Sequence, residues 1–352
     1  MALVSICLPN LNTQPYLEAR LESIFKQTMP DWELIVCDSH SSDGSWELFQ
    51  KYQNDRRVRL YQVPREGLFA GWNECLKRVT GKFVYIATSD DTAYPDLLSS
   101  LVGLLERNPE DGVAMGQFDF INHHGNVIPP TQGLPGDFFG EWRHKLHRRS
   151  GWIDFLVHTQ IGTSWTSITS ALFRADVVKQ AGYFRTDFGR GEAFGDRFWA
   201  MKIASLASTI YTPEKVATWR VHPAQASSAE SPGWRIKNLR ITEETIRECE
   251  GSIPDVWKDD PQWMPKLLFG MRQYYLQGYG LDRKCMKTEP RRFVRGLGRA
   301  ILHEPAYLGR RLASGLSWES DEMRNVNEVV RGLIKDWRVP WPPESMESHD
   351  DC

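Results

Sequence analysis

Short apolar runs alternate with longer segments in which apolar residues recur every three or four positions through the first part of the chain. The short runs predict buried strands, and the longer segments predict amphipathic helices. Strands that alternate with helices are typical of an α/β fold, with a mostly parallel sheet flanked by helices. Four strands are expected first and two strand-like pieces later, at residues 4–8, 33–37, 58–63, 82–87, 113–120 and 167–173.

A helix is expected after each of the first four strands. Pro15 opens the first predicted helix and Pro95 the fourth, because proline is well tolerated in the first turn. Asp43 begins the second. The third is marked by one apolar stripe, made of Phe69, Trp72, Leu76 and Val79.

Two later regions depart from this alternation. Residues 125–151 are rich in Gly, His and Arg without a regular period, and a long irregular segment in a domain is often a substrate-facing loop. Beyond residue 231 the pattern predicts helices and no strand, and residues 340–352, rich in Pro and acids, are expected to fray. We therefore expect an α/β domain at 1–230 and a helical, basic C-terminal extension at 231–352.

The composition excludes several classes of function. The 352 residues have a formal net charge of −2, so no overall positive field attracts nucleic acid, and no nucleic acid is expected as a partner. No apolar run approaches the roughly 18 residues that a membrane-spanning helix needs. The cysteines are scattered without a Cys-x-x-Cys pair, and Cys7 and Cys37 lie in predicted strands, which favours a reduced, cytoplasmic protein.

Polar residues follow each of the first four predicted strands, at residues 9–12, 38–44, 65–67 and 89–92. Open α/β sheets bind ligands at the carboxyl ends of their parallel strands. Asp90 and Asp91 are adjacent, and two carboxylates repel each other unless a positive charge lies beside them. Mg²⁺ or Mn²⁺ is the expected ion, because these metals prefer oxygen ligands and bridge carboxylates to phosphates. The alternative is that residues 90–92 only form a turn that caps the helix near Pro95.

Short motifs follow one another in a fixed order through the first part of the chain: VSICLPNLN at 4–12, SIFKQT at 23–28, ELIVCD at 33–38, SSDGS at 41–45, Gly67, Asn73, GKFVYI at 81–86 and SDD at 89–91. This ordered series resembles the family 2 inverting glycosyltransferases of the GT-A fold. The resemblance covers about the first two thirds of the chain and none of the region after 231. It implies a GT-A-like catalytic domain at 1–230 that moves a sugar from a nucleotide-diphosphate sugar to a hydroxyl acceptor, in polysaccharide or glycolipid assembly.

The resemblance also implies roles for the residues at the strand ends. Asp38 would accept a hydrogen bond from the nucleotide base, and Asp90 would reach the ribose or the metal. The implied ligands of Mg²⁺ or Mn²⁺ are Asp90, Asp91 and His222, although a histidine can also be satisfied by the backbone alone. The implied nucleotide-sugar site consists of Pro9, Asn10, Asn12, Asp38, Gly67, Asn73, Asp90 and Arg220.

Three positions near the implied donor site depart from the family pattern. Thr88 occupies the first acidic position of the common Asp-x-Asp form. His40 stands where the family usually has glycine, and Ser39 where it often has a second aspartate. These changes leave the metal dependence and the preferred base open.

A later segment resembles the part of the family in which an acidic pair opens a helix and its aspartate acts as the general base. Gly195 replaces the first member of that pair, so Asp196 is the predicted base, with Glu192 as a competitor. The alternative is that Asp196 only caps a helix that bears Phe198, Met201 and Ile203.

Three tryptophans, Trp142, Trp152 and Trp165, lie near the expected acceptor loop. They could stack on the faces of sugars or pack in the core, since aromatic residues dominate core burial. The sequence leaves both roles open.

Nine Lys and Arg residues gather between 283 and 311, opposed only by Glu289 and Glu304 and interleaved with apolar residues. Such a stretch can lie on an anionic membrane surface, which would suit a lipid-linked glycan as acceptor and a place at the inner face of a membrane. The alternative is a solvated basic face of helices that pack on the catalytic domain.

Two other functions fit parts of the sequence. Thr88 and Gly195, which stand where acids are usual, favour a catalytically silent nucleotide-sugar-binding or scaffold protein. Metal-dependent turnover would separate this function from a transferase. A nucleotidyltransferase on the same sheet would need a glycine-rich, Arg-containing N-terminal loop, which the sequence does not contain.

Overall fold

The computed structural model describes residues 2–130, 136–162, 167–187, 195–223, 225, 234–281, 283–306 and 325–346. Within these residues a ten-stranded sheet has the strand order β10-β7-β9-β5-β8-β4-β1-β2-β3, and β6 pairs with β5. The strands are β1 (Val4–Asn10), β2 (Trp32–Asp38), β3 (Val58–Gln62), β4 (Phe83–Ile86), β5 (Val113–Ile121), β6 (Val127–Ile128), β7 (His147–Arg149), β8 (Ala171–Arg174), β9 (Thr209–Arg220) and β10 (Glu344–Ser345).

The sheet is parallel at one side and mixed at the other. Strand β1 pairs in parallel with both β2 and β4, and β2 pairs in parallel with β3. Strand β8 then runs antiparallel between β4 and β5, and β9 runs parallel to β5. The carboxyl ends of β1, β2, β4 and β9 therefore meet at the same edge of the sheet, where a ligand site is expected.

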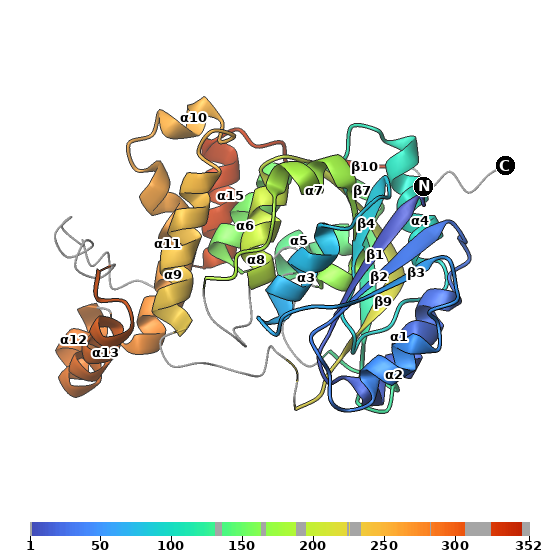
Figure 1. The fold of residues 1–352 in the computed structure, drawn as a ribbon. Helices are drawn as coiled ribbons and strands as arrows, with labels where there is room; N and C mark the ends of the chain where they lie inside the picture. The colour runs from blue at the N-terminus through green and yellow to red at the C-terminus, as the bar shows by residue number, and fades with distance from the viewer. Residues whose placement is uncertain are drawn as a thin grey trace.

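Alternating side chains along the strands face two helical layers (Figure 1). Ile6 and Leu8 belong to the core beneath α1 (Gln14–Phe25), α2 (Ser45–Gln50) and α4 (Leu97–Arg107). Cys7, between them, belongs to the core on the opposite face. The helices of that face are α3 (Leu68–Leu76), α6 (Gly151–Gln160), α7 (Ala175–Ala181) and α8 (Gly195–Ala204).

The C-terminal helices extend the second core. Leu239 and Leu267 are buried in one cluster with Phe155 of α6 and Phe198 of α8. Figure 1 shows α9 and α11 beside α6 and α8, on the side away from the sheet. The helices of this region are α9 (Trp234–Glu248), α10 (Asp255–Lys258), α11 (Trp263–Tyr279), α12 (Arg283–Thr288), α13 (Pro290–His303) and α15 (Val326–Asp336). The domain boundary predicted near residue 231 stays a prediction.

The expected α/β class and the first four strands are confirmed, each within two residues of the predicted bounds. Cys7 and Cys37 are buried and unpaired, as their place in strands predicted. The second helix begins at Ser45 rather than Asp43, because Gly44 has φ +95° and is not helical. The fourth begins at Leu97, two residues after Pro95.

Three expectations about irregular regions were wrong. The stretch 125–151 contains β6, the helices α5 (Gly136–Phe139) and η1 (Gly140–His144), and β7, which joins the sheet beside β9. The first half of the piece at 167–173 is a 3₁₀ turn, η2 (Ile168–Ser170). Residues 344–345 do not fray but form β10 on β7, so a strand does occur after residue 231. Register with distant strands, rather than local pattern, orders these segments.

Candidate functional site

A group of polar residues gathers where β1, β2, β4 and β9 end. We call Asn10, Asp38, Asp90, Asp91 and His222 the strand-end cluster. Asn10 and Asp38 are paired in the register of β1 and β2, and the Asn10 amide Nδ2 donates to Asp38 Oδ2 over 2.8 Å. Residues 91–94, which follow β4, cross to β9, where Thr92 and Thr218 hydroxyls lie 2.7 Å apart. This crossing brings Asp90 and Asp91 to the end of β9.

Asp38 fixes the loop that follows β2. Its Oδ1 accepts from the backbone N–H of Ser41, and its Oδ2 accepts from the Ser41 hydroxyl and from Asn10. Asp38 and Asn10 are both buried. Both carboxylate oxygens therefore have partners inside the protein, and the predicted hydrogen bond from Asp38 to a nucleotide base stays a prediction.

Asn12 and His40, in the loops that follow β1 and β2, both adopt an uncommon backbone conformation. Both have positive φ, +54° for Asn12 and +55° for His40. The Asn12 side chain accepts from Ser42 N–H over 2.8 Å, and its own N–H donates to the Ser41 hydroxyl. A positive φ favours glycine, which explains why glycine is usual at position 40 in the family. His40 is exposed at this point.

Asp90 forms a pair with His222. His222 Nε2 lies 3.0 Å from Asp90 Oδ2, and the ring packs against Tyr16 at a centroid distance of 4.7 Å. Burial favours a raised pKa for Asp90, but the hydrogen bond from His222 and its charge outweigh burial, so the pKa of Asp90 is lowered. His222 Nδ1 is buried and has no hydrogen-bond partner among the described residues. The alternative expected from the sequence, a histidine whose ring nitrogens bond only to the backbone, therefore does not apply to His222.

Asp91 points into the protein instead. The Thr88 hydroxyl donates to its Oδ2 over 2.7 Å, and the Arg220 N–H donates to its Oδ1 over 2.7 Å. Burial and the neighbouring charge of Asp90 raise the pKa of Asp91 to about 7. The two aspartates thus have different surroundings: Asp90 faces His222, and Asp91 ties β4 to β9. Neither caps α4, which follows Asp96, so the turn-and-cap alternative was wrong.

Arg220 secures the backbone around Asp90. Its Nε donates to the Asp90 carbonyl over 2.6 Å, and its Nη1 donates to the carbonyl of Asn122. Its guanidinium lies 5.0 Å from the ring centre of Tyr16. Arg220 is buried, so the structure places it behind Asp90 as a positioning group. The predicted contact of Arg220 with a diphosphate stays a prediction.

The remaining predicted donor residues lie around α3. Pro9 packs so closely on this helix that a Cβ on Gly71 would lie 2.8 Å from the Pro9 Cβ. Gly67 precedes α3 with φ +103°, which a glycine adopts without strain. The Asn73 side chain forms two hydrogen bonds with the backbone of Phe184: it accepts from the Phe184 N–H over 2.8 Å and donates to the Phe184 carbonyl over 2.9 Å. Asn73 therefore ties α3 to the segment before α8.

Asp196 lies in the first turn of α8. Its Oδ1 accepts from the N–H of Arg197 over 2.9 Å, and burial by the surrounding protein raises its pKa. A carboxylate with a raised pKa is suited to take a proton near neutral pH. The helix buries Phe198, Met201 and Ile203, as the pattern predicted. Its predicted competitor, Glu192, lies outside the described residues.

Arg197, which the sequence analysis missed, anchors this turn. Its buried guanidinium donates to the His158 carbonyl over 3.1 Å and to the Thr242 hydroxyl over 2.6 Å. It also lies 3.0 Å from the sulfur of Met271. These partners belong to α6, α9 and α11, so three helices hold the residue next to Asp196. No local motif signals this role, because the partners are distant in sequence.

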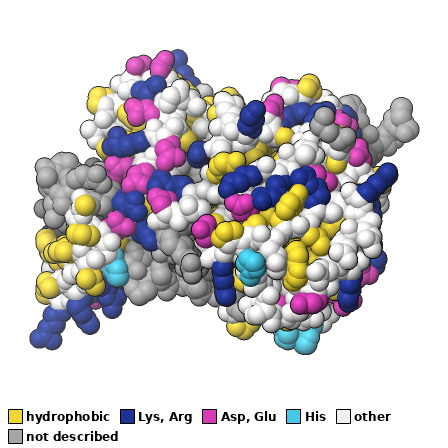
Figure 2. All heavy atoms as spheres, in the orientation of Figure 1, with side chains coloured by type: hydrophobic (Ala, Val, Ile, Leu, Met, Phe, Trp, Pro, Cys, Tyr) yellow, Lys and Arg dark blue, Asp and Glu magenta, His cyan; other side chains and the backbone are white. Residues whose placement is uncertain are grey.

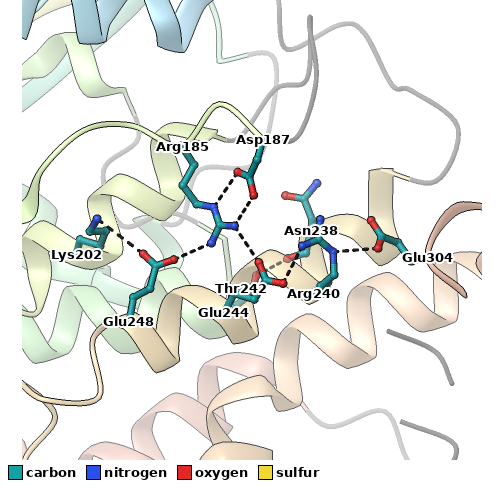
Figure 3. A network of polar contacts seen from close by, with 9 residues as sticks. All are labelled: Arg185, Asp187, Lys202, Asn238, Arg240, Thr242, Glu244, Glu248 and Glu304. Atoms are coloured by element: carbon teal, nitrogen blue, oxygen red, sulfur yellow. Dashed lines mark hydrogen bonds and ion pairs between the residues drawn. The ribbon is translucent and has the colours of Figure 1, made fainter. Parts of the chain in front are cut away.

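A second missed arginine, Arg185, joins the segment before α8 to α9 (Figure 3). Asp187 and two acids of α9, Glu244 and Glu248, surround its guanidinium; the nearest oxygens of Glu244 and Glu248 lie at 2.9 and 2.8 Å. The network continues through Arg240, which lies 2.7 Å from Glu244 and 2.9 Å from Glu304, just past α13. Helices α9 and α13 are thereby linked to the segment around 185.

Two of the three tryptophans pack against other side chains. Trp152 meets the ring of Trp257 edge to face at 5.0 Å, next to Phe155. Trp142 packs on His147 with ring centres 5.7 Å apart. Trp165 lies outside the described residues. Trp152 therefore packs in the core, which was the alternative to stacking on sugars.

Neither a complete metal cage nor a membrane-spanning helix occurs among the described residues. Within the described ranges, no three His, Cys, Asp or Glu side chains are grouped as a complete metal cage. None of the helices in the described part of the chain has the length and apolar character that crossing a bilayer demands.

The family of the chain follows from comparison with known sequences. A profile of the family described as "Glycosyl transferase family 2" matches residues 5–173. Through this segment the chain belongs to glycosyltransferase family 2. The family segment covers β1 to β8 apart from the first residue of β1 and the last of β8, and hence every member of the strand-end cluster except His222.

Curated relatives match this family 2 chain over part of their length. "Putative glycosyltransferase EpsE" of Bacillus subtilis is 31% identical over 139 residues, covering 38% of this chain and 50% of EpsE. "UDP-Glc:alpha-D-GlcNAc-diphosphoundecaprenol beta-1,3-glucosyltransferase WfgD" of Escherichia coli is 30% identical over 133 residues, covering 37% of this chain and 52% of WfgD. The matches thus span about half the length of these relatives.

Solved structures show the GT-A fold for the family 2 chain. TarS of S. aureus, solved with UDP-GlcNAc, superposes with a TM-score of 0.63 at 19% identity, over 95% of this chain and 89% of that one. The mannosyltransferase PcManGT of Pyrobaculum calidifontis, solved with GDP-Man and Mn²⁺, gives 0.51 at 18% identity, over 96% and 84%. At these identities the likeness concerns the fold alone. The predicted GT-A-like α/β fold is confirmed.

Proposed function

We propose that the protein is an inverting glycosyltransferase that moves a sugar from a nucleotide-diphosphate sugar to a hydroxyl of a glycan or lipid-linked glycan. The observation on which this proposal mainly rests is the Asp90–His222 pair at the carboxyl ends of β4 and β9, inside a GT-A fold. The names of relatives, among them a glucosyltransferase for a diphosphoundecaprenol acceptor, support a role in cell-surface polysaccharide or glycolipid assembly. A lipid-linked acceptor would place the reaction at the inner face of a membrane.

The strand ends supply a place for the donor. The loops after β1 and β2 are held by Asn10, Asn12 and Asp38, whose side chains are fixed by one another and by Ser41. Arg220 fixes the backbone of Asp90 from behind. A rigid backbone costs little conformational entropy on binding, so these contacts favour a preformed nucleotide site at this edge.

The residues around Asp90 fit a divalent metal, Mg²⁺ or Mn²⁺. Asp90 supplies carboxylate oxygens, and His222 supplies an imidazole with one buried nitrogen that has no partner among the described residues. Asp91 fits less well as a direct ligand, because both of its oxygens accept from protein donors. The proposed ligands are therefore Asp90 and His222, with the diphosphate completing the set. When bound, such a metal would neutralise the charge that develops on the departing diphosphate.

Asp196 is the proposed base. Its carboxylate takes the proton of the acceptor hydroxyl while that oxygen forms a bond to the anomeric carbon. The bond from the anomeric carbon to the diphosphate oxygen breaks, and its electron pair leaves with the nucleoside diphosphate. The oxygen attacks from the face opposite the leaving group, so the configuration inverts. The raised pKa of Asp196 favours its action as a base near neutral pH.

Calorimetric titration with UDP- and GDP-sugars, with and without Mn²⁺, tests the donor half of the proposal. We expect one donor to bind the wild-type protein in a Mn²⁺-dependent way, and Asp90→Asn to weaken this binding by about a hundredfold. The matched control is Asp31→Asn, which removes one exposed carboxylate elsewhere. Equal Mn²⁺-dependent binding by wild type and Asp90→Asn would contradict the assignment of Asp90.

A transfer assay on the same samples separates the two functional classes. Release of nucleoside diphosphate that depends on Mn²⁺ and on an acceptor supports the transferase. Tight donor binding with no release, with or without acceptor, would support the silent binding protein that Thr88 and Gly195 favour.

A further inference from the structure

Helix α13 presents a two-part surface that the proposed catalytic function does not use. One side of the helix is packed: Gly296 and Ala300 are buried, and Phe293 and Leu297 are half-buried. The helix contacts α9 and α11, and Glu304, just past its end, lies 2.9 Å from Arg240 of α9. The orientation of α13 is thus fixed, and its other side faces outward.

The outward side exposes large aliphatic residues. Val294 is 65% exposed, Ile301 48% and Leu302 76%. Val294 and Ile301 are seven positions apart and therefore lie on one strip of the helix, whereas Leu302 follows Arg295 by seven positions and lies on the adjoining strip. Met286 of the preceding helix α12 is 43% exposed. A cluster of exposed aliphatic side chains on one short segment indicates a surface that meets an apolar partner.

A row of arginines runs next to this strip. Arg291, Arg295 and Arg299 are exposed and spaced four positions apart, so they line one edge of the helix. No described acid lies within ion-pair distance of these three side chains, whereas the neighbouring Arg292 lies 3.6 Å from Glu289. Figure 2 shows Lys and Arg side chains beside hydrophobic ones at this end of the molecule, over α12 and α13.

We propose that α13 docks on an anionic lipid bilayer, parallel to its surface. The arginine row, Arg291, Arg295 and Arg299, would meet anionic headgroups, and the exposed aliphatic side chains, Val294, Ile301 and Leu302, would enter the boundary of the acyl chains. Charge complementarity favours this occupant, because arginines without an acidic partner among the described residues, directly beside exposed aliphatics, match the two layers of a lipid surface. The docking does not depend on the proposed sugar transfer. The predicted basic stretch continues to residue 311, but 307–311 lie outside the described residues.

Flotation of the full chain with vesicles tests the proposal. We expect recovery with vesicles of phosphatidylcholine and phosphatidylglycerol, little recovery with phosphatidylcholine alone, and weakening by salt. The triple variant Arg291→Gln/Arg295→Gln/Arg299→Gln should lower partitioning to the anionic vesicles about a hundredfold. The matched control is Lys26→Gln/Lys82→Gln/Lys215→Gln, which removes three exposed charges elsewhere and should leave partitioning within about threefold of wild type.

A second variant separates a bilayer from a merely acidic partner. Val294→Ser/Ile301→Ser/Leu302→Ser keeps every arginine and should still lower partitioning at least about tenfold. Its control is Val127→Ser/Val256→Ser, at two other exposed valines. Equal thermal melting of all variants establishes that they are folded. Equal recovery with neutral and anionic vesicles, or full binding by the serine variant, would overturn the proposal.

Discussion

The strand-end cluster and the start of α8 are held in place by different means. In the strand-end cluster, Asn10, Asp38 and Asp91 are bound by neighbouring strand ends or by residues three positions away. At the start of α8, Arg197 binds Thr242 and Met271, which lie 45 and 74 positions further along the chain. The first region is therefore fixed by the strand ends of the family segment and of β9, whereas the second depends on helices outside residues 5–173.

This difference predicts which substitutions act on one region alone. A substitution in the strand-end cluster should alter donor binding and leave α8 intact. A change in the contacts of α9 or α11 with α8 should alter the rate of transfer and leave donor binding unchanged. Comparing KM for the donor with kcat therefore separates the two regions.

The largest effect is expected at Asp196. Asp196→Asn keeps the shape of the side chain but cannot accept a proton, so kcat should fall by about 10²–10⁴ while the donor still binds. In the wild type, kcat should decrease at acidic pH as Asp196 is protonated, and at a higher pH than for an ordinary aspartate, because its pKa is raised. A pH profile of kcat measures this. Full activity of a folded Asp196→Asn protein would remove Asp196 from the reaction.

The second-largest effect on kcat is expected from substitution of Arg197. Arg197→Met deletes the donor to Thr242 and to the His158 carbonyl, so we expect a loss of about 1–3 kcal/mol of unfolding free energy. The first turn of α8 should loosen, and kcat should fall about 10–100-fold with an unchanged KM for the donor. Arg197→Lys should restore part of kcat. Urea unfolding and steady-state kinetics give both quantities.

The control for Arg197 is Arg247→Gln, an exposed arginine of α9 whose one ion pair within the described part of the chain is with Glu243; it should change neither quantity. A drop in donor affinity for Arg197→Met equal to its drop in kcat would contradict the separation of the two regions.

The two regions also differ in how far the sequence alone predicts them. The strands, the polar turns and the Asp90–Asp91 pair follow from local pattern, because a strand end and its turn are set by adjacent residues. The different roles of Asp90 and Asp91 do not follow from local pattern, since they depend on Thr88 and on the backbone of Arg220, across the sheet.

Tertiary contacts account for what was missed around α8. Arg197 and Arg185 resemble any solvated arginine in the sequence, and only their distant partners give them a role. The order within residues 125–151 was missed for the same reason, because β7 exists through its pairing with β9.

Another effect concerns the free energy of unfolding at acidic pH, around α6, rather than kcat. Burial lowers the pKa of His158 to about 3, and burial together with Arg149 lowers that of His147 to about 4. Both histidines gain a proton near pH 6.5 in the unfolded chain but stay neutral when folded. The unfolded state therefore binds more protons between pH 6.5 and about 4, so stability is full above pH 6.5 and is lost as the pH falls.

The expected slope is up to about 1.4 kcal/mol per pH unit for each histidine. Urea unfolding at pH 7, 6 and 5 measures it, and His147→Gln should remove about half of the slope. A free energy of unfolding that stays constant from pH 7 to 5 would contradict the neutral state of both rings.

The smallest effect is expected at Arg185, whose side chain is 17% exposed within the acidic network of Figure 3. Because water and salt screen partly exposed ion pairs, Arg185→Gln should cost about 1 kcal/mol or less of unfolding free energy. Its partners Glu244 and Glu248 belong to α9, so the segment before α8 should loosen and KM for the acceptor should rise a few-fold. KM for the donor should not change, and raising the salt to 1 M should shrink the difference from wild type. A loss of kcat as large as that of Arg197→Met would mean that the network around Arg185, rather than the buried contacts of Arg197, sets the position of Asp196.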